Sequence, residues 1–500
     1  MANLVIILSD QHNPRVMGCA GHGLVRTPNL DRLAARGTRF SSAYTNCPIC
    51  VPARASLATG RYVHQIRFWD NAIAYDGSVP SWGHRLMERG HSAISIGKLH
   101  YVRSDPARNG FNEEILPMHL ADGDGDVAGL IRDELIVRKG AAKLGPEAGP
   151  GESHYTAYDR SIAERACQWL EHEARRHGAK PWVLYVGFVC PHPPLIAPPE
   201  FFGLYADCDI PMPDMYAENE RPRHPYIEHM RLARPYDAGF TGPEMVKRAI
   251  AAYMGSVSFL DHNVGRVLAA LDRAGLADST RVIYGSDHGE NLGVRGLWAK
   301  STLYEESAGI PLLLAGPGVP AGRVVKDPVS LVDIFPTVLD CAGIERGAED
   351  AALPGSSLLP AASGGGLPGR TVLSEYHAVG SPSGSFMMRR GRYKYIHYCG
   401  YAPMLFDLES DPYERNDLAC VADFGSELAA CEDRLRAIVD PEAIDRLARA
   451  DQAAMIERLG GKSAIMKRGA VRHTPPPGVA STRIDVERVS DKASQIGRPR

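Results

Sequence analysis

The stretch that decides the fold is Leu4-Val5-Ile6-Ile7-Leu8-Ser9-Asp10-Gln11, in which an unbroken apolar run ends in polar residues. Such a run is typical of a strand buried on both faces, as in the parallel sheets of α/β proteins. Ligands of open α/β sheets bind just beyond the carboxyl ends of the strands. The stretch therefore predicts a sheet and also the edge at which a site would form.

Similar β-rich runs alternate with longer amphipathic segments over the first 370 residues, which predicts an α/β fold with a mostly parallel sheet between helices. Further strands are expected at Ser92–Gly97, Trp182–Val189, Arg281–Ser286 and Pro311–Ala315. Helices are expected at Pro28–Arg36, Ser81–Arg89, Tyr158–Arg176 and Glu244–Ala274. Two Pro- and Gly-rich stretches, 105–152 and 193–242, lack a clear period, and we expect them to select the substrate.

The pattern changes after residue 370. Four short runs predict a small antiparallel sheet, followed by a helix near Phe424–Ile438; they are Thr371–Tyr376, Phe386–Arg390, Tyr393–Tyr398 and Leu405–Asp407. We therefore expect an α/β catalytic domain over 1–370, an antiparallel-sheet subdomain over 371–440, and a helical and Pro-rich tail over 441–500. The tail could bury little surface alone, so we predict that it contacts another subunit of a homo-oligomer or stays mobile.

The bulk composition excludes several classes of function. A hydrophobic content of 44% with 23% charged residues is typical of a globular protein in water. A net charge of −3 gives no general attraction to nucleic acid or anionic membranes, and no apolar run could span a bilayer. The N-terminus lacks the features of a signal peptide, so a cytoplasmic location is expected. The ten cysteines are scattered, which favours reduced thiols over a disulfide framework.

Polar and ionisable side chains follow four of the predicted strands. They are Asp10 and Gln11, then Lys98 and His100, then His192, and finally Asp287 and His288. One such residue could belong to a turn, but four strand ends of this kind predict one charged site. Asp10, Asp287 and His288 supply two carboxylates and an imidazole, which suit one divalent cation such as calcium, magnesium or manganese. A polar turn at residues 287–289 is the alternative.

Cys50 is expected at the start of a short helix, because Pro52 suits the first turn of a helix and Gly60 its end. The positive end of the helix dipole would then favour an anion beside residue 50. Arg54, one turn later, would present its guanidinium to an oxyanion on the same face. Cys47 and Cys50 also form a C-x-x-C, so redox chemistry, half a zinc site and a merely structural Cys47 are alternatives.

Together these motifs resemble the sulfatase family of the alkaline phosphatase superfamily. The matching segments follow the family's order up to about residue 440. They are Leu8-Ser9-Asp10-Gln11, Cys50-x-Pro52-x-Arg54 with Thr59-Gly60, Gly97-Lys98-Leu99-His100, Pro191-His192-x-Pro194, Ser286-Asp287-His288-Gly289, Lys300, Arg392-Tyr393-Lys394-Tyr395, and Leu405-Phe406-Asp407 through Asp411-Pro412. The resemblance implies an alkaline-phosphatase-like α/β fold with a smaller C-terminal antiparallel sheet.

In such enzymes the cysteine of C-x-P-x-R is oxidised after translation to formylglycine, and the resemblance implies this for Cys50. One hydroxyl of the hydrated aldehyde, made more acidic by the metal, would attack sulfur and expel the alcohol. The second hydroxyl would lose its proton and eject sulfate, which restores the aldehyde. The implied partners are a small-molecule sulfate ester and, during maturation, a formylglycine-generating enzyme.

The resemblance also implies the metal ligands. Asp10, Asp287, His288 and residue 50 would hold one divalent ion, with Gln11 as a further ligand or a neighbour of the ligands. Calcium is favoured, and manganese is the alternative because of the imidazole.

Further residues are implied to act on the substrate. Arg54, Lys98 and Lys300 would neutralise the sulfate oxygens. His192 or Lys300 would protonate the leaving alcohol, and His100 would hold or deprotonate the hydrated aldehyde.

Three residues depart from the commonest sulfatase pattern, which has Asp in place of Gln11, Ser in place of Ala53 and Asn in place of His288. The Gln11 and His288 pair resembles choline sulfatases and phosphonate monoester hydrolases, and Asn71 matches a substrate-oxygen donor of the latter unless it is a turn residue. Lys98 and His100 instead resemble a sulfatase pair that contacts sulfate.

Sulfate ester hydrolysis therefore ranks first, and phosphonate monoester or phosphodiester hydrolysis second. A silent anion-binding homologue that keeps its thiol is the third hypothesis.

Overall fold

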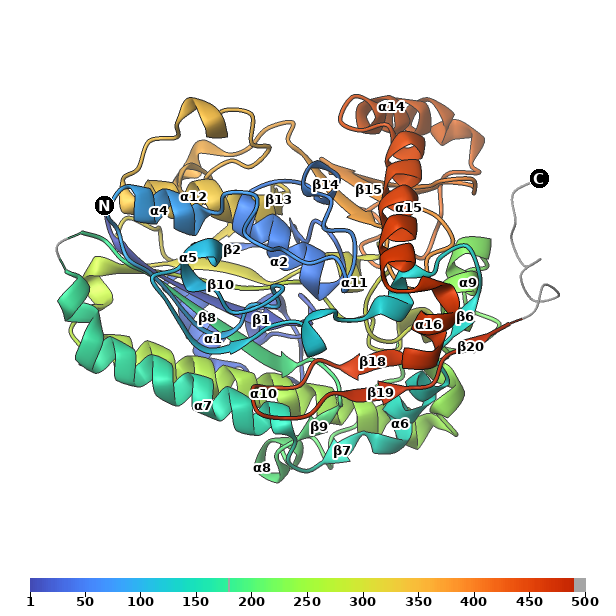
Figure 1. Cartoon of the computed structure of the whole chain (residues 1–500), viewed down its shortest axis with the longest axis horizontal. Coiled ribbons are helices and arrows are strands. Elements are labelled where there is room, and N and C mark those ends of the chain that lie inside the picture. The colour runs from blue at the N-terminus through green and yellow to red at the C-terminus, as the bar shows by residue number, and fades with distance from the viewer. Residues whose placement is uncertain (179, 490–500) are drawn as a thin grey trace.

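The computed structural model describes residues 1–178 and 180–489, and its centre is an eight-stranded sheet in the order β12-β2-β11-β10-β1-β8-β4-β5 (Figure 1). β1 (Asn3–Asp10) pairs in parallel with β10 (Thr280–Ser286) on one side and β8 (Val183–Pro191) on the other. β4 (Ala93–Lys98) continues the parallel order between β8 and β5 (Glu113–Met118). These five strands form the parallel part of the predicted sheet.

The other edge of the sheet changes direction. β11 (Leu312–Ala315) is antiparallel to both β10 and β2 (Gly37–Phe40), and β12 (Arg323–Val325) pairs in parallel with β2. All five strands expected in this sheet are confirmed, whereas β2, β5 and β12 were not predicted. They are edge strands or short strands with partly exposed residues, so their sequences lack the continuous apolar pattern of a buried strand.

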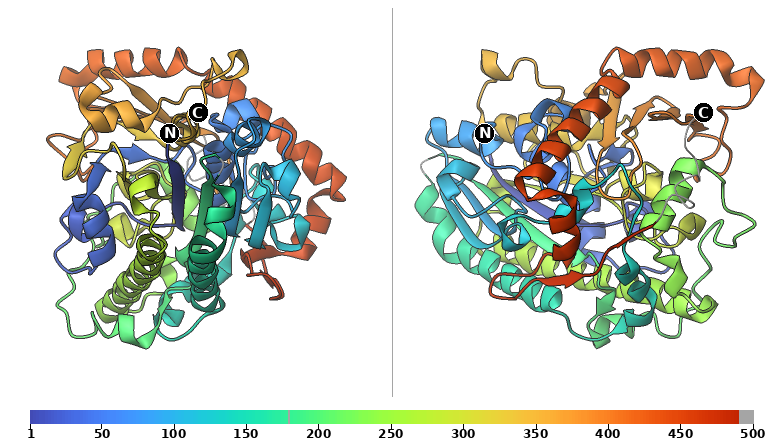
Figure 2. Two further views of the ribbon diagram at one scale, coloured as in Figure 1. Left: turned by 90° about the vertical axis from the view of Figure 1, so that its left-hand side faces the viewer. Right: turned by 45° about the vertical axis from the view of Figure 1, so that its right-hand side comes forward.

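Helices cover both faces of the sheet because residues of β1 alternate between two cores. Leu4, Ile6 and Leu8 pack towards α2 (Cys50–Thr59), α4 (Trp82–Glu88) and α12 (Ile334–Ala342), which lie above the sheet in Figure 1. Val5 and Ile7 pack towards α1 (Pro28–Ala35), α7 (His154–Gln168) and α10 (Pro243–Arg273) below it. Figure 2 shows α7 and α10 side by side beneath the sheet. The predicted three-layer α/β architecture is therefore confirmed.

The predicted small antiparallel sheet is also present. It consists, in order, of β14 (Thr371–Tyr376), β15 (Ser385–Arg390), β16 (Tyr393–Tyr398) and β17 (Met404–Asp407), and α14 (Gly425–Arg436) packs on it. The boundaries drawn between the domains at residues 370 and 440 stay a prediction.

Shorter elements lie in the connections. They are β3 (Ala43–Tyr44), α3 (Val63–Ile66), α5 (Pro106–Asn109), β6 (Ile136–Val137), α6 (Leu144–Glu147), β7 (Gly149–Pro150), β9 (Ile196–Ala197), α8 (Pro199–Phe202), α9 (Pro225–Ala233), α11 (Glu305–Ala308), β13 (Val329–Ser330) and α13 (Leu358–Pro360). The helix expected to reach Arg176 is α-helical only to Gln168, and a π turn over Trp169–Glu173 and a 3-10 turn over Ala174–His177 follow.

The tail folds back along its own chain. α15 (Pro441–Arg458) and α16 (Gly461–Arg468) lead into a hairpin of β18 (Ala470–His473) and β19 (Thr482–Ile484), and β20 (Glu487–Arg488) pairs with β6. Figure 1 shows these elements, in red, towards the right-hand side of the molecule. A contact with another subunit stays a prediction, and residues 490–500 lie outside the described part of the chain.

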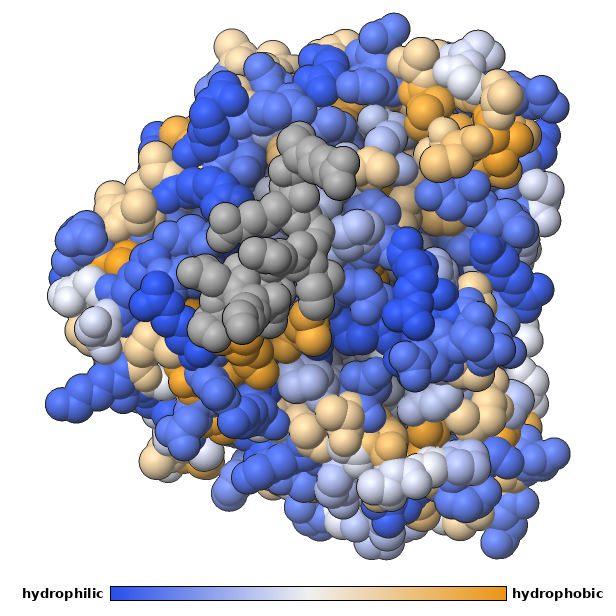
Figure 3. Space-filling model, turned by 90° about the vertical axis from the view of Figure 1, so that its right-hand side faces the viewer, coloured by the Kyte–Doolittle hydropathy of each residue, from blue (hydrophilic) through white to orange (hydrophobic). Residues whose placement is uncertain are grey.

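The face that lies at the right of Figure 1 is drawn in Figure 3, where most of the coloured residues are hydrophilic and the hydrophobic ones form small scattered groups. Within residues 1–178 and 180–489, no helix has both the length and the apolar character needed to cross a membrane.

Candidate active site

The carboxyl ends of four parallel strands bring the predicted polar residues together. Asp10 ends β1 and Lys98 ends β4, while His192 and Asp287 directly follow β8 and β10. Because β10, β1, β8 and β4 are neighbours in this order and run in the same direction, their ends meet at one edge of the sheet. The predicted helix α2 begins at Cys50 above this edge, and Gly60 ends it in the left-handed conformation, with φ of 66°.

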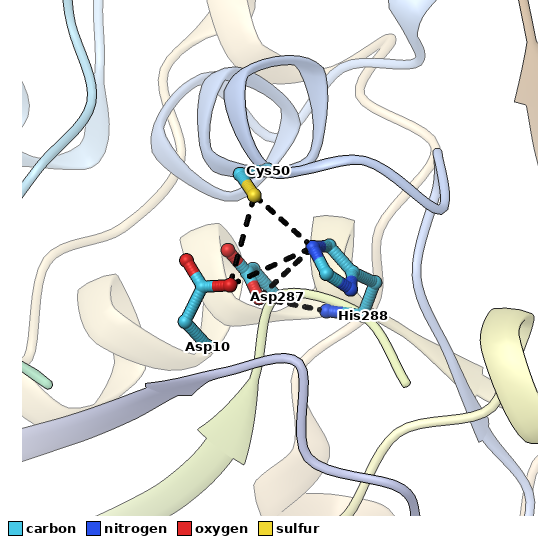
Figure 4. Close-up of side chains that lie close together, drawn as sticks. All are labelled: Asp10, Cys50, Asp287 and His288. Carbon is cyan, nitrogen blue, oxygen red and sulfur yellow. Dashed lines mark hydrogen bonds and ion pairs between the residues drawn. The ribbon is translucent and has the colours of Figure 1, made fainter. Parts of the chain in front are cut away.

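Cys50 is buried between groups of opposite charge. Its Sγ lies 3.6 Å from Asp10 Oδ1 and 3.2 Å from His288 Nε2 (Figure 4). Lys300 Nζ also lies 3.2 Å from this sulfur. Burial, with the nearby charge of Asp10, raises the pKa of the Cys50 thiol to about 11 although Lys300 opposes it. Without a metal ion, the thiol is therefore uncharged at neutral pH, which makes the unmodified sulfur a poor nucleophile.

Four of the predicted metal ligands form one group. The ligand atoms of Asp10, Cys50, Asp287 and His288 all lie within 4.8 Å of one another, and all four residues are buried. His288 Nδ1 lies 3.0 Å from the carbonyl oxygen of Gly289, which can only accept, so Nδ1 carries the proton and Nε2 keeps its lone pair. Burial also lowers the pKa of His288. Two carboxylates and a neutral imidazole fit a divalent cation.

Arg54 and Lys98 hold the carboxylates in place. Arg54 donates from Nε to Asp287 at 2.8 Å and from an Nη atom to Asp10 at 3.1 Å, and Lys98 Nζ lies 2.6 Å from Asp10. Burial alone would raise the pKa of Asp10, but the cations around it, Lys98 first, hold that pKa well below its ordinary value. Arg54 also donates to Tyr185 at 3.0 Å. Its guanidinium thus binds protein groups here, and its predicted contact with sulfate stays a prediction.

Lys300 and Gln11 are linked beside Cys50. Lys300 Nζ donates to Gln11 Oε1 at 2.7 Å, and the Gln11 amide in turn donates to the buried carboxylate of Glu290. Burial would lower the pKa of Lys300, but its interactions with the acidic groups Cys50, Asp10 and Asp287 outweigh burial and raise that pKa. The Gln11 oxygen therefore faces Lys300, which places Gln11 beside the ligand group.

A pocket opens over Cys50 and is lined by predicted substrate residues. Among its walls are Gln11, Asn71, Lys98, His100, His192 and Lys300. Asn71 Oδ1 accepts from the backbone N–H of Val51 at 3.2 Å, so Asn71 also holds the N-terminus of α2. His192 Nδ1 lies 2.7 Å from the carbonyl oxygen of Pro193, which fixes the proton on that nitrogen. The pocket brings the predicted cations and imidazoles to the predicted nucleophile.

The hairpin β18–β19 forms one wall of this pocket, which was not predicted. Thr474 Oγ1 lies 2.8 Å from His100 Nε2, and the Thr474 carbonyl accepts from the Tyr155 hydroxyl at 2.7 Å. The ring of His473 packs against that of His192 with centroids 5.8 Å apart, and burial lowers the pKa of His473 to about 3. The tail sequence carried no motif that would place it here, because these contacts join residues far apart in the chain.

Positive φ angles cluster at the site. Gln11, His100, Ala299 and Ser301 have φ of 66°, 63°, 58° and 83°, values that residues other than glycine rarely adopt. Such strain persists where the surrounding contacts over-determine the backbone, and it gathers at functional sites.

Comparison with known proteins agrees with this geometry. Residues 2–344 match the family model described as Sulfatase, and residues 293–438 match the model described as N-sulphoglucosamine sulphohydrolase, C-terminal. The chain is 34% identical over 464 residues to the choline-sulfatase of Rhizobium meliloti (strain 1021), covering 90% of this chain and 89% of that one. It is 32% identical over 441 residues to the arylsulfatase K of Homo sapiens, covering 83% and 78% of the two chains.

Solved structures share the fold. A phosphonate monoester hydrolase of Agrobacterium radiobacter superposes with a TM-score of 0.68 at 23% identity, covering 90% of this chain and 96% of that one. A protein solved in complex with its substrate D-glucosamine-2-N,6-O-disulfate gives a TM-score of 0.69 at 22% identity, covering 90% and 98%.

Proposed function

Because this chain belongs to the sulfatase family and hydrolyses sulfate esters, we propose that residue 50, converted from cysteine to formylglycine, is its nucleophile and is held on a divalent metal. The observation that carries the proposal is the convergence of the Asp10, Asp287 and His288 ligand atoms on Cys50 Sγ.

The side chains around residue 50 have separate proposed roles. Asp10, Asp287, His288 and residue 50 would hold the metal, which supplies Lewis acidity at the sulfuryl oxygens and at the nucleophile. Calcium fits the carboxylate oxygens, and manganese is the alternative because of the imidazole. Hydrated formylglycine carries two hydroxyls on one carbon, so one can attack sulfur and the other can later expel sulfate.

The pocket cations act on the sulfate group. Lys98 and Lys300 line the pocket next to residue 50, and a buried lysine beside a transferred sulfuryl group stabilises the negative charge of the transition state. His192 and Lys300 both line this pocket, so either would deliver a proton to the leaving oxygen, Lys300 from its ammonium group and His192 from Nε2 once the imidazole is doubly protonated. His100, whose Nε2 contacts Thr474, would hold or deprotonate the hydrated aldehyde.

Hydrolysis of phosphonate monoesters or phosphodiesters is the second candidate activity. Asn71 lines the pocket beside the start of α2, and Gln11 and His288 occupy positions where many sulfatases have Asp and Asn. A monoanionic phosphonate ester has a charge and shape close to those of a sulfate ester, so the same pocket would accept it.

Mass spectrometry of the peptide that contains residue 50, from active enzyme made in its native host, tests the nucleophile. We expect an aldehyde or its hydrate, and finding only thiol in fully active enzyme would refute the formylglycine mechanism. Steady-state rates with an aryl sulfate, a phosphodiester and a phosphonate monoester test the ranking of the activities. A higher kcat/KM for the phosphonate than for the sulfate would reverse that ranking.

A further inference from the structure

Three arginines line the pocket besides the predicted substrate residues, each from a different segment outside the central sheet, and we call this part of the lining the outer pocket. Arg138 follows β6, Arg234 follows α9, and Arg472 lies in β18. The backbone N–H of Arg138 donates to the carbonyl of Ala233 at 2.9 Å, so the first two segments join at this wall. These segments belong to the two irregular stretches expected to select the substrate and to the tail.

Two of the three arginines are neutralised by protein carboxylates. The Nη atoms of Arg138 donate to both oxygens of Asp126, at 2.7 and 3.1 Å. Arg472 forms an ion pair with Glu147. A pair of this kind has little charge left for a ligand.

Arg234 differs from both. It is 9% exposed, and within residues 1–178 and 180–489 no carboxylate forms an ion pair with it. Among the described residues, its one side-chain hydrogen bond joins Nη1 to Ser301 Oγ at 3.0 Å, and its buried Nε has no acceptor. A guanidinium has five N–H donors, so most of them lack a protein partner. A buried charge that stays unpaired is costly unless a ligand completes its hydrogen bonds.

Arg234 is connected to the residues around Cys50 through Ser301. Ser301, which Arg234 contacts, follows Lys300, and Lys300 Nζ lies 3.2 Å from Cys50 Sγ. Arg234 and Cys50 line the same pocket, so the alcohol part of an ester bound at residue 50 would extend past this guanidinium.

We propose that Arg234 binds a second anionic group, a carboxylate or a second sulfate, carried by the alcohol part of the sulfate ester. The inference rests on the proposed function and names its substrate class. The planar fork of arginine matches the paired oxygens of carboxylate and sulfate. An alcohol that carries a positive charge would instead be repelled by the unpaired guanidinium.

A set of sulfate esters of similar size tests the proposal with the mature enzyme. The esters are 3,3-dimethylbutyl sulfate, which is neutral beyond the sulfate, choline sulfate, which is its cationic counterpart, 4-sulfooxybutanoate, which adds a carboxylate, and butane-1,4-diol disulfate, which adds a sulfate. We expect kcat/KM for the better anionic ester to exceed that for the neutral ester by at least about tenfold, with choline sulfate the poorest. Whichever anionic ester is preferred identifies the second group.

Arg234→Gln should lower the ratio of kcat/KM for the anionic ester to that for the neutral ester by about tenfold or more, and Arg234→Lys by less. The matched control is Arg223→Gln, on the same segment but with a side chain that is 64% exposed, and it should leave the ratio unchanged. If Arg234 merely supported Ser301, the variant would lower kcat/KM for all the esters equally, which would overturn the proposal.

Binding separates this inference from the proposed function and is available even if the Arg234 variants do not fold. Calorimetric titration of the Cys50→Ala protein, which has no nucleophile, should show tighter binding of the anionic esters than of the neutral one. Equal or weaker binding would overturn the proposal while sulfate release by the wild type still stood. Preferential binding without sulfate release from any ester by mature enzyme would support Arg234 and refute the proposed function.

Discussion

The catalytic centre and the outer pocket differ in how their charges are balanced. In the centre, Asp10 and Asp287 are paired with Arg54 and Lys98, and all four side chains are buried and stand on strand ends or on α2. The outer pocket is built from irregular segments and the tail hairpin, and one of its arginines, Arg234, has no carboxylate partner in the part of the chain that the structure describes. The catalytic residues are thus held by the sheet and α2, whereas the irregular segments and the tail hairpin contact the rest of the substrate.

The difference predicts where substitutions matter most. In the centre, removing one group disturbs several partners and the reaction itself. In the outer pocket, a change should alter rates modestly or only for particular substrates, because fewer protein groups depend on each side chain.

The largest effect is expected for Cys50→Ala. Loss of the nucleophile should lower kcat at least about 10⁴-fold, measured as sulfate released from an aryl sulfate, while the thermal unfolding profile stays cooperative. Cys47→Ala is the matched control, since Cys47 is also buried but belongs to a hydrophobic cluster, and it should keep most of the activity. An active Cys50→Ala protein would move the reaction away from this centre.

Metal removal should come next. Dialysis against a chelator should lower kcat/KM by about 10³-fold, because Lewis acidity at the sulfuryl group is lost, and calcium or manganese should restore it. A cation present at 100 to 1,000 times its Kd would stabilise the fold by about 3–4 kcal/mol, so the unfolding temperature should fall on removal. In Asp287→Asn, calorimetry should show the same unfolding temperature with and without chelator. Full activity in metal-free wild type would contradict the metal model.

A lower pH should destabilise the β18–β19 hairpin. The pKa of His473 is lowered to about 3, against about 6.5 in an unfolded chain, so the unfolded segment binds more protons between these values. The stabilising effect of neutral His473 is complete above pH 6.5 and is lost as pH falls towards 3, by roughly 1–2 kcal/mol at pH 5. Hydrogen exchange of residues 470–484 should show less protection at pH 5 than at pH 7. In His473→Gln the difference in protection between the two pH values should become smaller, and an undiminished difference there would exclude His473 as the cause.

The smallest effect is expected for Thr474→Val. Loss of the hydroxyl that contacts His100 should cost about 1 kcal/mol, or roughly a fivefold lower kcat for an aryl sulfate. Thr474→Ser keeps the hydroxyl and should restore most of the rate. A loss as large as that of Cys50→Ala would place the hairpin within the catalytic centre and remove the contrast between the two regions.

The residues of the catalytic centre could be predicted from the sequence, whereas those of the outer pocket could not. Asp10, Lys98, His192 and Asp287 follow buried strands with a strong apolar pattern, and the geometry of parallel strands makes such ends meet. The short strand β5 escaped prediction because its residues are largely half-exposed, so they do not alternate clearly.

The outer pocket could not be predicted in the same way. Arg234 lies in a stretch without periodicity, and nothing local reveals that it lacks a carboxylate. Thr474 meets His100 across 374 residues of sequence, a contact that depends on how α15 and α16 pack. The prediction that the tail contacts another subunit was made from composition, which says nothing of where a segment docks.

The burial of Cys50 also limits the time during which this cysteine can be modified. Lys300, which stands 3.2 Å from its sulfur, is synthesised 250 residues later. At roughly 5–20 residues per second, the ribosome needs about 10–50 seconds to add them. Any enzyme that oxidises this cysteine must act before the core closes or hold the chain open afterwards, because the finished core leaves Cys50 1% exposed. The yield of active protein should therefore depend on the pace of translation as well as on the abundance of the modifying enzyme.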